Sequence, residues 1–402
     1  MKLVVQKFGG SSVKDAESLR RVAGIITDTY KAGNNVIVVV SAQGDTTDDL
    51  IEKAKEISKN PSKREMDMLL TTGEQISASL LAMTIADMGY PAVSLTGWQA
   101  GMTTTSTYSN ARIKKINTDR LNAELDKKNI VIVTGFQGLN KYDDMTTLGR
   151  GGSDTSAVAL AAACHADLCE IYTDVDGVYT TDPRIAPNAK KLDEITYDEM
   201  LELASLGANV LHNRSVELAK KYNVNLCVRS SITRAEGTIV KEVTKVESMM
   251  VRGIAKDNDV ARISICHIED TPGKAFRIFS LLAKHNINVD IILQSIGREN
   301  TKDISFTVSE GKLQETLDII EEHKDIIGYG DLSYTTEVSK VSIVGAGMVT
   351  NPGVAAKMFE ALFDANINIH MIATSEIQVS VLIDQGLENL AVRAIQDKFE
   401  LA

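Results

Sequence analysis

The sequence is poor in cysteine and in net positive charge, and each shortage excludes a class of protein. Its four cysteines, Cys164, Cys169, Cys227 and Cys266, lack the CxxC and Cys/His spacings of zinc sites and form no disulfide framework. We interpret them as reduced packing residues of a cytoplasmic protein. Acidic residues outnumber basic ones 54 to 43, for a net charge of −11, so no overall positive field attracts nucleic acid.

Long hydrophobic runs are also missing. The longest aliphatic stretches, near residues 36–40 and 157–164, are too short to span a bilayer, and the N-terminus has no apolar signal-peptide region. We therefore expect neither secretion nor membrane insertion. The length of 402 residues suggests roughly two to four domains, each with its own hydrophobic core.

Up to about residue 240, short aliphatic runs alternate with amphipathic stretches, the pattern of an α/β fold with a largely parallel sheet covered by helices. Strands are expected at 3–6, 35–41, 92–96, 130–134, 168–173 and 226–229. Helices are expected at 16–31, 46–59, 76–88, 117–127, 155–163 and 197–206. Ligands of such sheets bind beyond the carboxyl ends of the strands, so the polar residues that follow several strands favour a site over ordinary connections.

A glycine pair, Gly9 and Gly10, follows the first expected strand and is preceded by Lys7. Glycines let the backbone approach a phosphate closely, and a helix that starts beyond them adds N–H donors. A glycine pair alone more often forms an ordinary turn, but the lysine favours a phosphate site. A second glycine turn at 149–155 carries Arg150, which can bind a carboxylate or phosphate, and Asp154. Ser153 or Asp154 is placed to cap the next helix, so the spacing leaves a catalytic and a capping role for Asp154 equally open.

Six ordered motifs resemble the aspartokinase family: KFGGSS at 7–12, VSAQGDTT at 40–47, TTGEQIS at 71–77, GFQG at 135–138, GRGGSDTSA at 149–157 and YTDVDGVYTTDPR at 172–184. The resemblance extends over essentially the whole chain. It implies a three-layer αβα amino-acid kinase domain at 1–245. It also implies transfer of the γ-phosphoryl group of ATP, with Mg²⁺, to the β-carboxylate of L-aspartate. The product, 4-phospho-L-aspartate, begins the pathway to lysine, threonine and methionine.

The same resemblance assigns roles to individual residues. Lys7 is expected to neutralise charge on the transferring group, Asp154 to orient Lys7, and Arg150 to pair with the α-carboxylate of aspartate. The other expected substrate-binding residues are Ser41, Thr47, Glu74, Phe136 and Ser153, with Glu74 near the α-amino group. The expected nucleotide-binding residues, besides Lys7, are Gly9, Gly10, Ser11, Thr173, Asp174, Tyr179, Asp182, Arg184 and Asn209. No protein metal site is predicted, and the ionised β-carboxylate needs no strong general base.

Asn209 departs from the family, which often has lysine in a GAKVLHPRS-like segment where this chain reads GANVLHNRS at 207–215. We expect an effect on ATP affinity, which Lys190, Lys191 or Arg184 can offset. His212 is interpreted as a packing or turn residue. The departure also supports one alternative, a catalytically silent amino-acid-binding regulator. A second alternative is a kinase for another amino acid, such as glutamate.

The C-terminal part contains an internal repeat. Residues 270–295 and 350–375 align without gaps at an offset of 80, with ten identities in 26 positions. Each copy resembles an ACT domain, a βαββαβ (ferredoxin-like) amino-acid sensor. We assign 262–338 to the first ACT domain and 339–402 to the second, whose last strand is missing. A strand over 249–255, within the segment 249–258, is expected to complete the second sheet, so that the first domain is inserted into the second.

In the family, lysine, threonine or both inhibit by binding at ACT interfaces, and the sequence does not discriminate between these effectors. The candidate effector residues are Asp270, Gly273, Ala275, Asn288, Asp290, Gln294, Asn351, Gly353, Ile372, Ser375 and Glu376. A dimerisation role without a ligand is the alternative for this region. Paired ACT modules favour a homodimer or an α₂β₂ tetramer, and an internal start near Met249 suggests a separate regulatory subunit.

Overall fold

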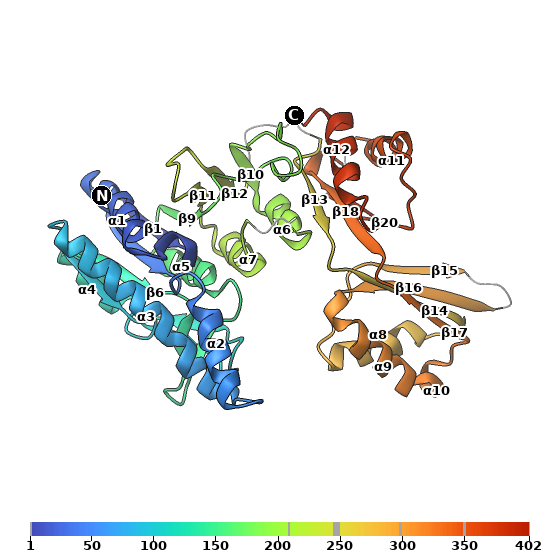
Figure 1. Cartoon of the computed structure of the whole chain (residues 1–402), viewed down its shortest axis with the longest axis horizontal. Coiled ribbons are helices and arrows are strands. Elements are labelled where there is room, and N and C mark those ends of the chain that lie inside the picture. Colours follow the sequence, from blue (N-terminus) through green and yellow to red (C-terminus); the bar gives the residue numbers. More distant parts are fainter. Residues whose placement is uncertain (1, 208–209, 244–249, 297–299, 349–350, 402) are drawn as a thin grey trace. The chain divides into compact units, whose positions relative to one another are not determined.

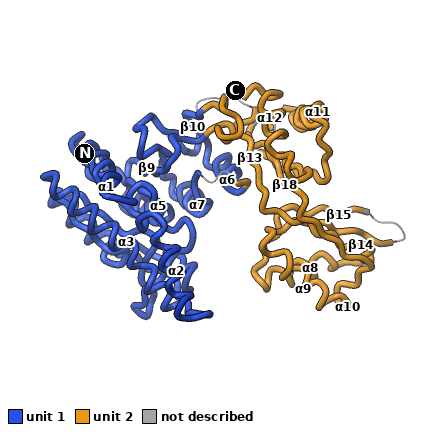
Figure 2. The backbone as a smooth tube through the Cα atoms, viewed as in Figure 1, with its two compact units in different colours: residues 1–178, 191–205, 209–245 blue, residues 179–190, 206–208, 246–402 orange. Residues whose placement is uncertain are grey.

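The computed structural model describes residues 2–207, 210–243, 250–296, 300–348 and 351–401 (Figure 1). The chain divides into two compact units (Figure 2). The first comprises residues 1–178, 191–205 and 209–245, and the second comprises residues 179–190, 206–208 and 246–402. The range predicted for the kinase domain, 1–245, includes two segments that belong to the second unit, 179–190 and 206–208. No helix within the described ranges is long and apolar enough to cross a membrane.

The first unit is built on an eight-stranded sheet with the order β10-β12-β11-β9-β1-β2-β6-β3. All its neighbouring strands are parallel except β11 and β12, which confirms the predicted largely parallel sheet. The strands are β1 (Leu3–Phe8), β2 (Asn35–Val40), β3 (Ala92–Leu95), β6 (Ile130–Thr134), β9 (Leu168–Thr173), β10 (Glu194–Thr196), β11 (Leu226–Ser230) and β12 (Thr238–Lys241). The central strands are buried on both faces, which explains their continuous aliphatic sequences.

Helices cover both faces of this sheet. The helices of the first unit are α1 (Ala16–Lys31), α2 (Thr46–Ile57), α3 (Lys63–Asp87), α4 (Asp119–Asp126), α5 (Gly152–Ala163), α6 (Tyr197–Ser205) and α7 (Asn213–Tyr222). Alternate residues of β2, at 36, 38 and 40, pack in one core with α1 and α3. The residues between them, Ile37 and Val39, are fully buried too, and α5 contacts β1, β2 and β9. The unit therefore has the three layers that the sequence predicted.

Helix α3 is longer than the sequence suggested. It begins at Lys63, not at residue 76, and the Ser62 side chain caps it by accepting a hydrogen bond from the Glu65 N–H at 3.3 Å. The helix contains three consecutive poor helix formers, Thr71, Thr72 and Gly73. For this reason the sequence did not predict a helix through these residues. As a result Asp67 and Glu74, both buried, lie on one helix two turns apart.

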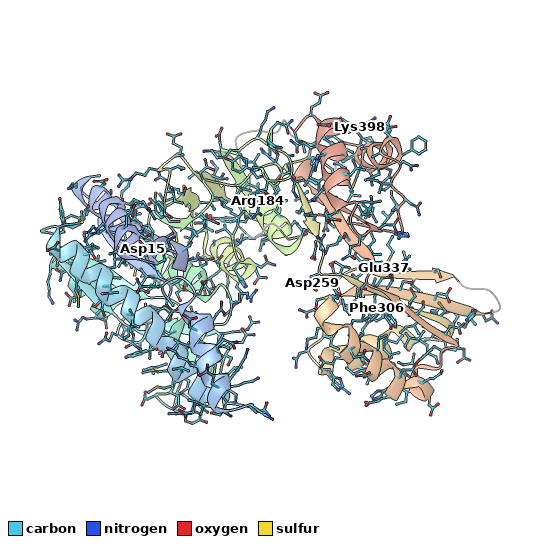
Figure 3. The ribbon with its side chains drawn as sticks, in the orientation of Figure 1. Asp15, Arg184, Asp259, Phe306, Glu337 and Lys398 are labelled. Atoms are coloured by element: carbon cyan, nitrogen blue, oxygen red, sulfur yellow. The ribbon has the colours of Figure 1, made fainter. Side chains whose placement is uncertain are left out.

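A small sheet with the order β5-β4-β7-β8 was not predicted. Its strands are β4 (Met102–Thr104), β5 (Ile113–Ile116), β7 (Gln137–Leu139) and β8 (Met145–Thr147). Each has only three or four residues, too few for an alternating pattern to stand out. The short helix η1 (Gly10–Val13) lies between β1 and α1, and the Asp15 side chain, seen in Figure 3, caps α1.

The second unit contains two four-stranded antiparallel sheets. The first module has the order β15-β16-β14-β17 and the second β13-β18-β20-β19. The first module consists of β14 (Ala261–Glu269), α8 (Lys274–Lys284), β15 (Ile292–Ile296), β16 (Thr301–Val308), η2 (Glu310–Lys312), α9 (Leu313–Glu322), α10 (Lys324–Ile327) and β17 (Asp331–Thr335). The second consists of β18 (Val338–Val344), η3 (Ala346–Met348), α11 (Val354–Asp364), β19 (Met371–Thr374), β20 (Gln378–Asp384) and α12 (Glu388–Phe399).

Strand β13 (Gly253–Asp257) supplies the edge strand that the second module lacks. It pairs antiparallel with β18, with Gly253 opposite Val344 and Asp257 opposite Lys340. The pairing expected for the segment before the first module is therefore present from residue 253, while Met249 lies outside the described residues. Both modules have separate cores, and Phe306 (Figure 3) packs edge-to-face on Phe279 in the first one.

The segment 179–190, which follows the first unit's β9, packs with the second module. The Ile254 N–H donates to the Thr180 carbonyl at 2.8 Å, and the Thr180 hydroxyl donates to the Leu401 carbonyl at 2.9 Å. Asn188 accepts from the Gln396 amide at 3.1 Å. Since Thr180 is fully buried, these bonds explain why the segment groups with the second unit.

Candidate active site

Lys7 and Asp154 form an ion pair at the carboxyl end of β1. Lys7 Nζ lies 2.6 Å from Asp154 Oδ1, and the two side chains are only 11% and 13% exposed. Lys7 belongs to β1 and Asp154 to the first turn of α5, which packs on that strand. Water screens such a pair weakly, so the lysine is held as a fixed positive charge at the edge where ligands of parallel sheets bind.

Asp154 does not cap its helix. We expected Ser153 or Asp154 at the N-cap, but α5 begins at Gly152 and its N-cap is Gly151, with φ of 70° and no side-chain capping bond. A Cβ on Gly151 would lie 2.2 Å from the His212 ring, so only glycine fits there. The capping alternative for Asp154 is therefore wrong, and its observed partner is Lys7.

The loop after β1 packs closely against the loop after β2. A Cβ on Gly10 would lie 2.6 Å from the Ala42 carbonyl oxygen, and the Gly44 N–H donates to the Gly10 carbonyl at 3.1 Å. Gly9 is next to the ammonium of Lys7, and Ser11 is exposed. The helix that follows directly is the four-residue η1 and not the long α1, so the predicted helix start beyond the glycines is a single short turn.

Glu74 lies beside the same loop. It is 3% exposed, and its Oε1 accepts a hydrogen bond from the Ala42 N–H at 3.2 Å. Its Oε2 is buried and makes no hydrogen bond to any described residue. Burial raises the pKa of this carboxyl to about 8. Glu74 therefore offers a buried oxygen that a ligand N–H can satisfy.

The remaining expected substrate residues adjoin this region. Ser41 follows β2, and its N–H donates to the Phe8 carbonyl at 3.2 Å, while Thr47 is half-buried in the first turn of α2. Phe136 has a φ of 70°, and its N–H donates to the Ser156 hydroxyl of α5 at 3.0 Å. Ser153 is buried, whereas Arg150 is exposed on the turn before α5.

The expected nucleotide residues fall into three groups. Thr173 is the last residue of β9 in the first unit, and Asp174 follows it. The Thr173 hydroxyl bonds within its own turn, and the Ser231 N–H donates to the Thr173 carbonyl at 3.1 Å. Tyr179, Asp182 and Arg184 belong to the segment that packs in the second unit. Arg184 (Figure 3) binds Asp182 through two nitrogens at 3.0 and 2.8 Å, which lowers the pKa of Asp182. Asn209 lies outside the described residues.

Two of the candidate effector residues, Gly273 and Gly353, occupy equivalent places in the two modules. Gly273 and Gly353 precede α8 and α11 with φ of 94° and 98°. Asp270 binds Lys302 at 2.5 Å, and Asp290 binds Lys340. Ala275 is partly buried against the first core. Ile372 is 42% exposed on the edge strand β19, and the other candidates are exposed or half-buried: Asn288, Gln294, Asn351, Ser375 and Glu376.

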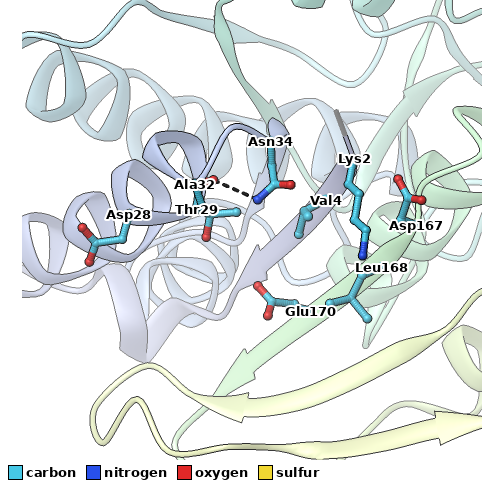
Figure 4. Close-up of a pocket in the computed structure, with 9 residues that line it drawn as sticks. All are labelled: Lys2, Val4, Asp28, Thr29, Ala32, Asn34, Asp167, Leu168 and Glu170. Carbon is cyan, nitrogen blue, oxygen red and sulfur yellow. Dashed lines mark hydrogen bonds between the residues drawn. The ribbon is translucent and has the colours of Figure 1, made fainter.

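A pocket of about 560 Å³ lies at the amino-terminal end of β1, whereas Lys7 is near the carboxyl end of that strand. Figure 4 shows the residues that line the pocket. It is lined by the amino-terminal ends of β1 and β9 and the end of α1: Lys2, Val4, Asp28, Thr29, Ala32, Asn34, Asp167, Leu168 and Glu170. None of these residues was predicted to bind a ligand, and two of them form ion pairs: Asp28 with Arg234, and Glu170 with Arg229.

Sequence comparison places the chain among known proteins. The amino acid kinase family matches residues 2–230, and ACT domains match residues 261–328 and 341–399. The aspartokinase of Bacillus sp. (strain MGA3) is 51% identical over 403 residues, which cover 100% of this chain and 98% of that protein.

Two solved structures extend this likeness to the fold. The structure of E. coli aspartokinase III with aspartate and ADP, in the R-state, has a TM-score of 0.84 at 26% identity and covers 99% of both chains. Its T-state complex with lysine and aspartate has a TM-score of 0.77 at 26% identity, again over 99% of both chains.

Proposed function

Since the chain belongs to the aspartokinase family and is an ATP-dependent aspartate kinase, we propose that its reaction takes place around the Lys7–Asp154 pair. The observation that carries this proposal is the 2.6 Å contact between their charged groups at the carboxyl ends of the parallel strands. Phosphoryl transfer needs positioned positive charge on the γ-phosphoryl oxygens more than it needs a base. Lys7 supplies that charge, and Asp154 fixes its direction.

Aspartate binds between the loop after β2, helix α3 and the start of α5. Arg150 pairs with the α-carboxylate, and the buried Oε2 of Glu74 accepts from the α-ammonium. Ser41, Thr47, Phe136 and Ser153 line the rest of the pocket. This set is complementary to a zwitterion, and it leaves the β-carboxylate directed toward Lys7 as the nucleophile.

ATP lies along the loop formed by Gly9, Gly10 and Ser11, with Thr173 and Asp174 at the end of β9. Tyr179, Asp182, Arg184 and Asn209 complete the proposed nucleotide segment. Mg²⁺ bound with ATP would neutralise phosphate charge, and the exposed carboxylate of Asp174 would be available to hold it.

The ACT modules bind lysine, threonine or both as feedback inhibitors. Support comes from the related E. coli enzyme, whose T-state structure holds lysine, and from two modules with the same glycine start at α8 and α11. Their edge strands β15 and β19 expose Ile292, Leu293 and Ile372, the surface needed for a homodimer or an α₂β₂ tetramer.

The four unpaired thiols fit a cytoplasmic location.

Mg²⁺-ATP-dependent ADP release tests the proposal. The full chain is assayed with L-aspartate and with L-glutamate, each alone and with lysine, threonine or both. We expect turnover with aspartate only, reduced by at least one effector. Turnover with glutamate would contradict the assignment of an aspartate-specific pocket. Turnover that no effector changes would contradict the assignment of a sensing role to the ACT modules.

A further inference from the structure

The turn that carries Arg150 is held from two sides by side chains that were not among the expected site residues, Asp67 and Arg214. Arg150 itself is exposed, and it is flanked by Gly149 and Gly151, which both have positive φ. Such a turn has little intrinsic preference for one conformation. Its geometry therefore depends on the residues that bind its backbone.

Asp67 holds the strand that leads into the turn. It is fully buried in α3, and its carboxylate accepts from the Thr147 N–H at 2.9 Å and the Thr147 hydroxyl at 2.8 Å. The same carboxylate accepts from the Ser109 N–H at 2.9 and 3.0 Å. All these donors are neutral, and no cation pairs with Asp67 within the described ranges. The charge is thus stabilised by hydrogen bonds that join α3, residue 109 and β8.

Arg214 holds the turn from the other side. Its Nη1 donates to the Leu148 carbonyl at 2.5 Å, and its Nη2 donates to the Ala111 carbonyl at 3.0 Å. The planar guanidinium therefore joins the segment of residues 109–111 to the end of β8, the same two segments that Asp67 joins. These segments also bind each other directly, because the Ala111 N–H donates to the Thr147 carbonyl at 2.8 Å. Arg214 lies in the first turn of α7, two residues after His212, whose ring packs against Gly151.

We propose that Asp67 and Arg214 are positioning residues that fix the backbone of residues 147–151 and so place the Arg150 guanidinium for the α-carboxylate of aspartate. This inference rests on the proposed substrate contact of Arg150. Neither residue touches the substrate. Because a bound carboxylate needs the guanidinium at one distance and angle, a small displacement of this turn weakens substrate binding.

The test is a double-mutant cycle of Asp67→Asn and Arg150→Ala, with KM for aspartate, kcat and KM for ATP measured on the full chain. Asp67→Asn keeps the shape but replaces an accepting oxygen by a donor facing Thr147 or Ser109. We expect KM for aspartate to rise about 5- to 20-fold in Asp67→Asn and about 10- to 100-fold in Arg150→Ala, with kcat and KM for ATP nearly unchanged. In the double variant the effect of Asp67→Asn should vanish, because its target is gone.

Two further variants keep the test decisive. Arg214→Lys retains the charge but loses the fork that binds two carbonyls, so it should raise KM for aspartate even if Asp67→Asn does not fold. Asp87→Asn, at an exposed position of α3, is the matched control and should leave all constants unchanged. Additive effects of Asp67→Asn and Arg150→Ala would overturn the positioning role. An unchanged KM in Arg150→Ala would instead show that the proposed contact of Arg150 with substrate is wrong.

Discussion

The Glu74 carboxyl group binds the Ala42 N–H through one oxygen, at 3.2 Å, and its other oxygen is buried without a donor from the described part of the chain. Ala42 is the residue whose carbonyl approaches Gly10. A single residue therefore links the loop proposed for phosphates to the carboxyl group proposed for the substrate ammonium. Burial raises the pKa of Glu74 to about 8, which favours the protonated form of this carboxyl group.

Glu74→Gln should change how stability depends on pH. The pKa of Glu74 rises from 4.5 in the unfolded chain to about 8 in the folded one. Between these values the folded protein keeps a proton that the unfolded chain releases. The wild-type free energy of unfolding should therefore fall relative to Glu74→Gln as pH rises, by at most about 1.4 kcal/mol per pH unit.

Urea unfolding of both proteins across this pH window measures the effect. Glu65→Gln, an exposed change on the same helix, is the control and should follow the wild type. Parallel pH profiles for the wild type and Glu74→Gln would contradict the assignment of a raised pKa.

Gly10→Ala should damage the loop after β1. Its Cβ would lie 2.6 Å from the Ala42 carbonyl oxygen, so one of the two loops must move. We expect a loss of roughly 1–3 kcal/mol in the free energy of unfolding and a clear rise in KM for ATP. Thermal unfolding and initial rates check this. Gly311→Ala is the matched control, because nothing lies within 4 Å of its Cβ position; equal behaviour of the two variants would refute the close approach.

Lys340→Met should loosen the contact between the two ACT modules. Lys340 is 4% exposed in β18 of the second module and binds Asp290 of the first, while Asp257 of β13 lies 3.7 Å from its ammonium. Removing it leaves two carboxylates facing each other, and burial already raises the pKa of Asp257. We expect a destabilisation of roughly 1–3 kcal/mol, moderated because Asp290 is half-exposed.

Denaturant unfolding measures the effect, with Lys398→Met as the control. Lys398 (Figure 3) pairs with two exposed carboxylates of α11. The control should lose less than about 1 kcal/mol. If Lys340→Met were no less stable than the control, the pairing across the modules would not contribute to the fold.

The main sheet was predictable because its strands are continuous aliphatic runs. The predicted strand at 130–134 matches β6, and that at 168–173 matches β9. The start of α5 was placed three residues too late, because Gly151 and Gly152 resemble a loop in sequence although Gly152 already belongs to the helix. The small sheet around β4 and β8 escaped notice because its strands are too short to show a period.

The candidate site, too, was predictable only where local sequence indicates its residues. Lys7, Arg150 and Asp154 lie in glycine-rich motifs, so local sequence indicates them. Asp67 and Arg214 act through contacts with residues 42 to 104 positions away in the chain, and no spacing rule reaches that far. The raised pKa of Glu74 likewise depends on burial by other segments, which a single sequence does not reveal.

The most direct test of the account is the turnover of Lys7→Ala, measured as ADP release at saturating Mg²⁺-ATP and aspartate. Lys7 acts on charge that develops in the transition state, so kcat should fall about 100- to 1000-fold while the fold and the KM for aspartate change little. Lys55→Ala, which removes an exposed lysine of α2, should keep wild-type turnover. A Lys7→Ala enzyme with a kcat near that of Lys55→Ala would contradict the assignment of this site.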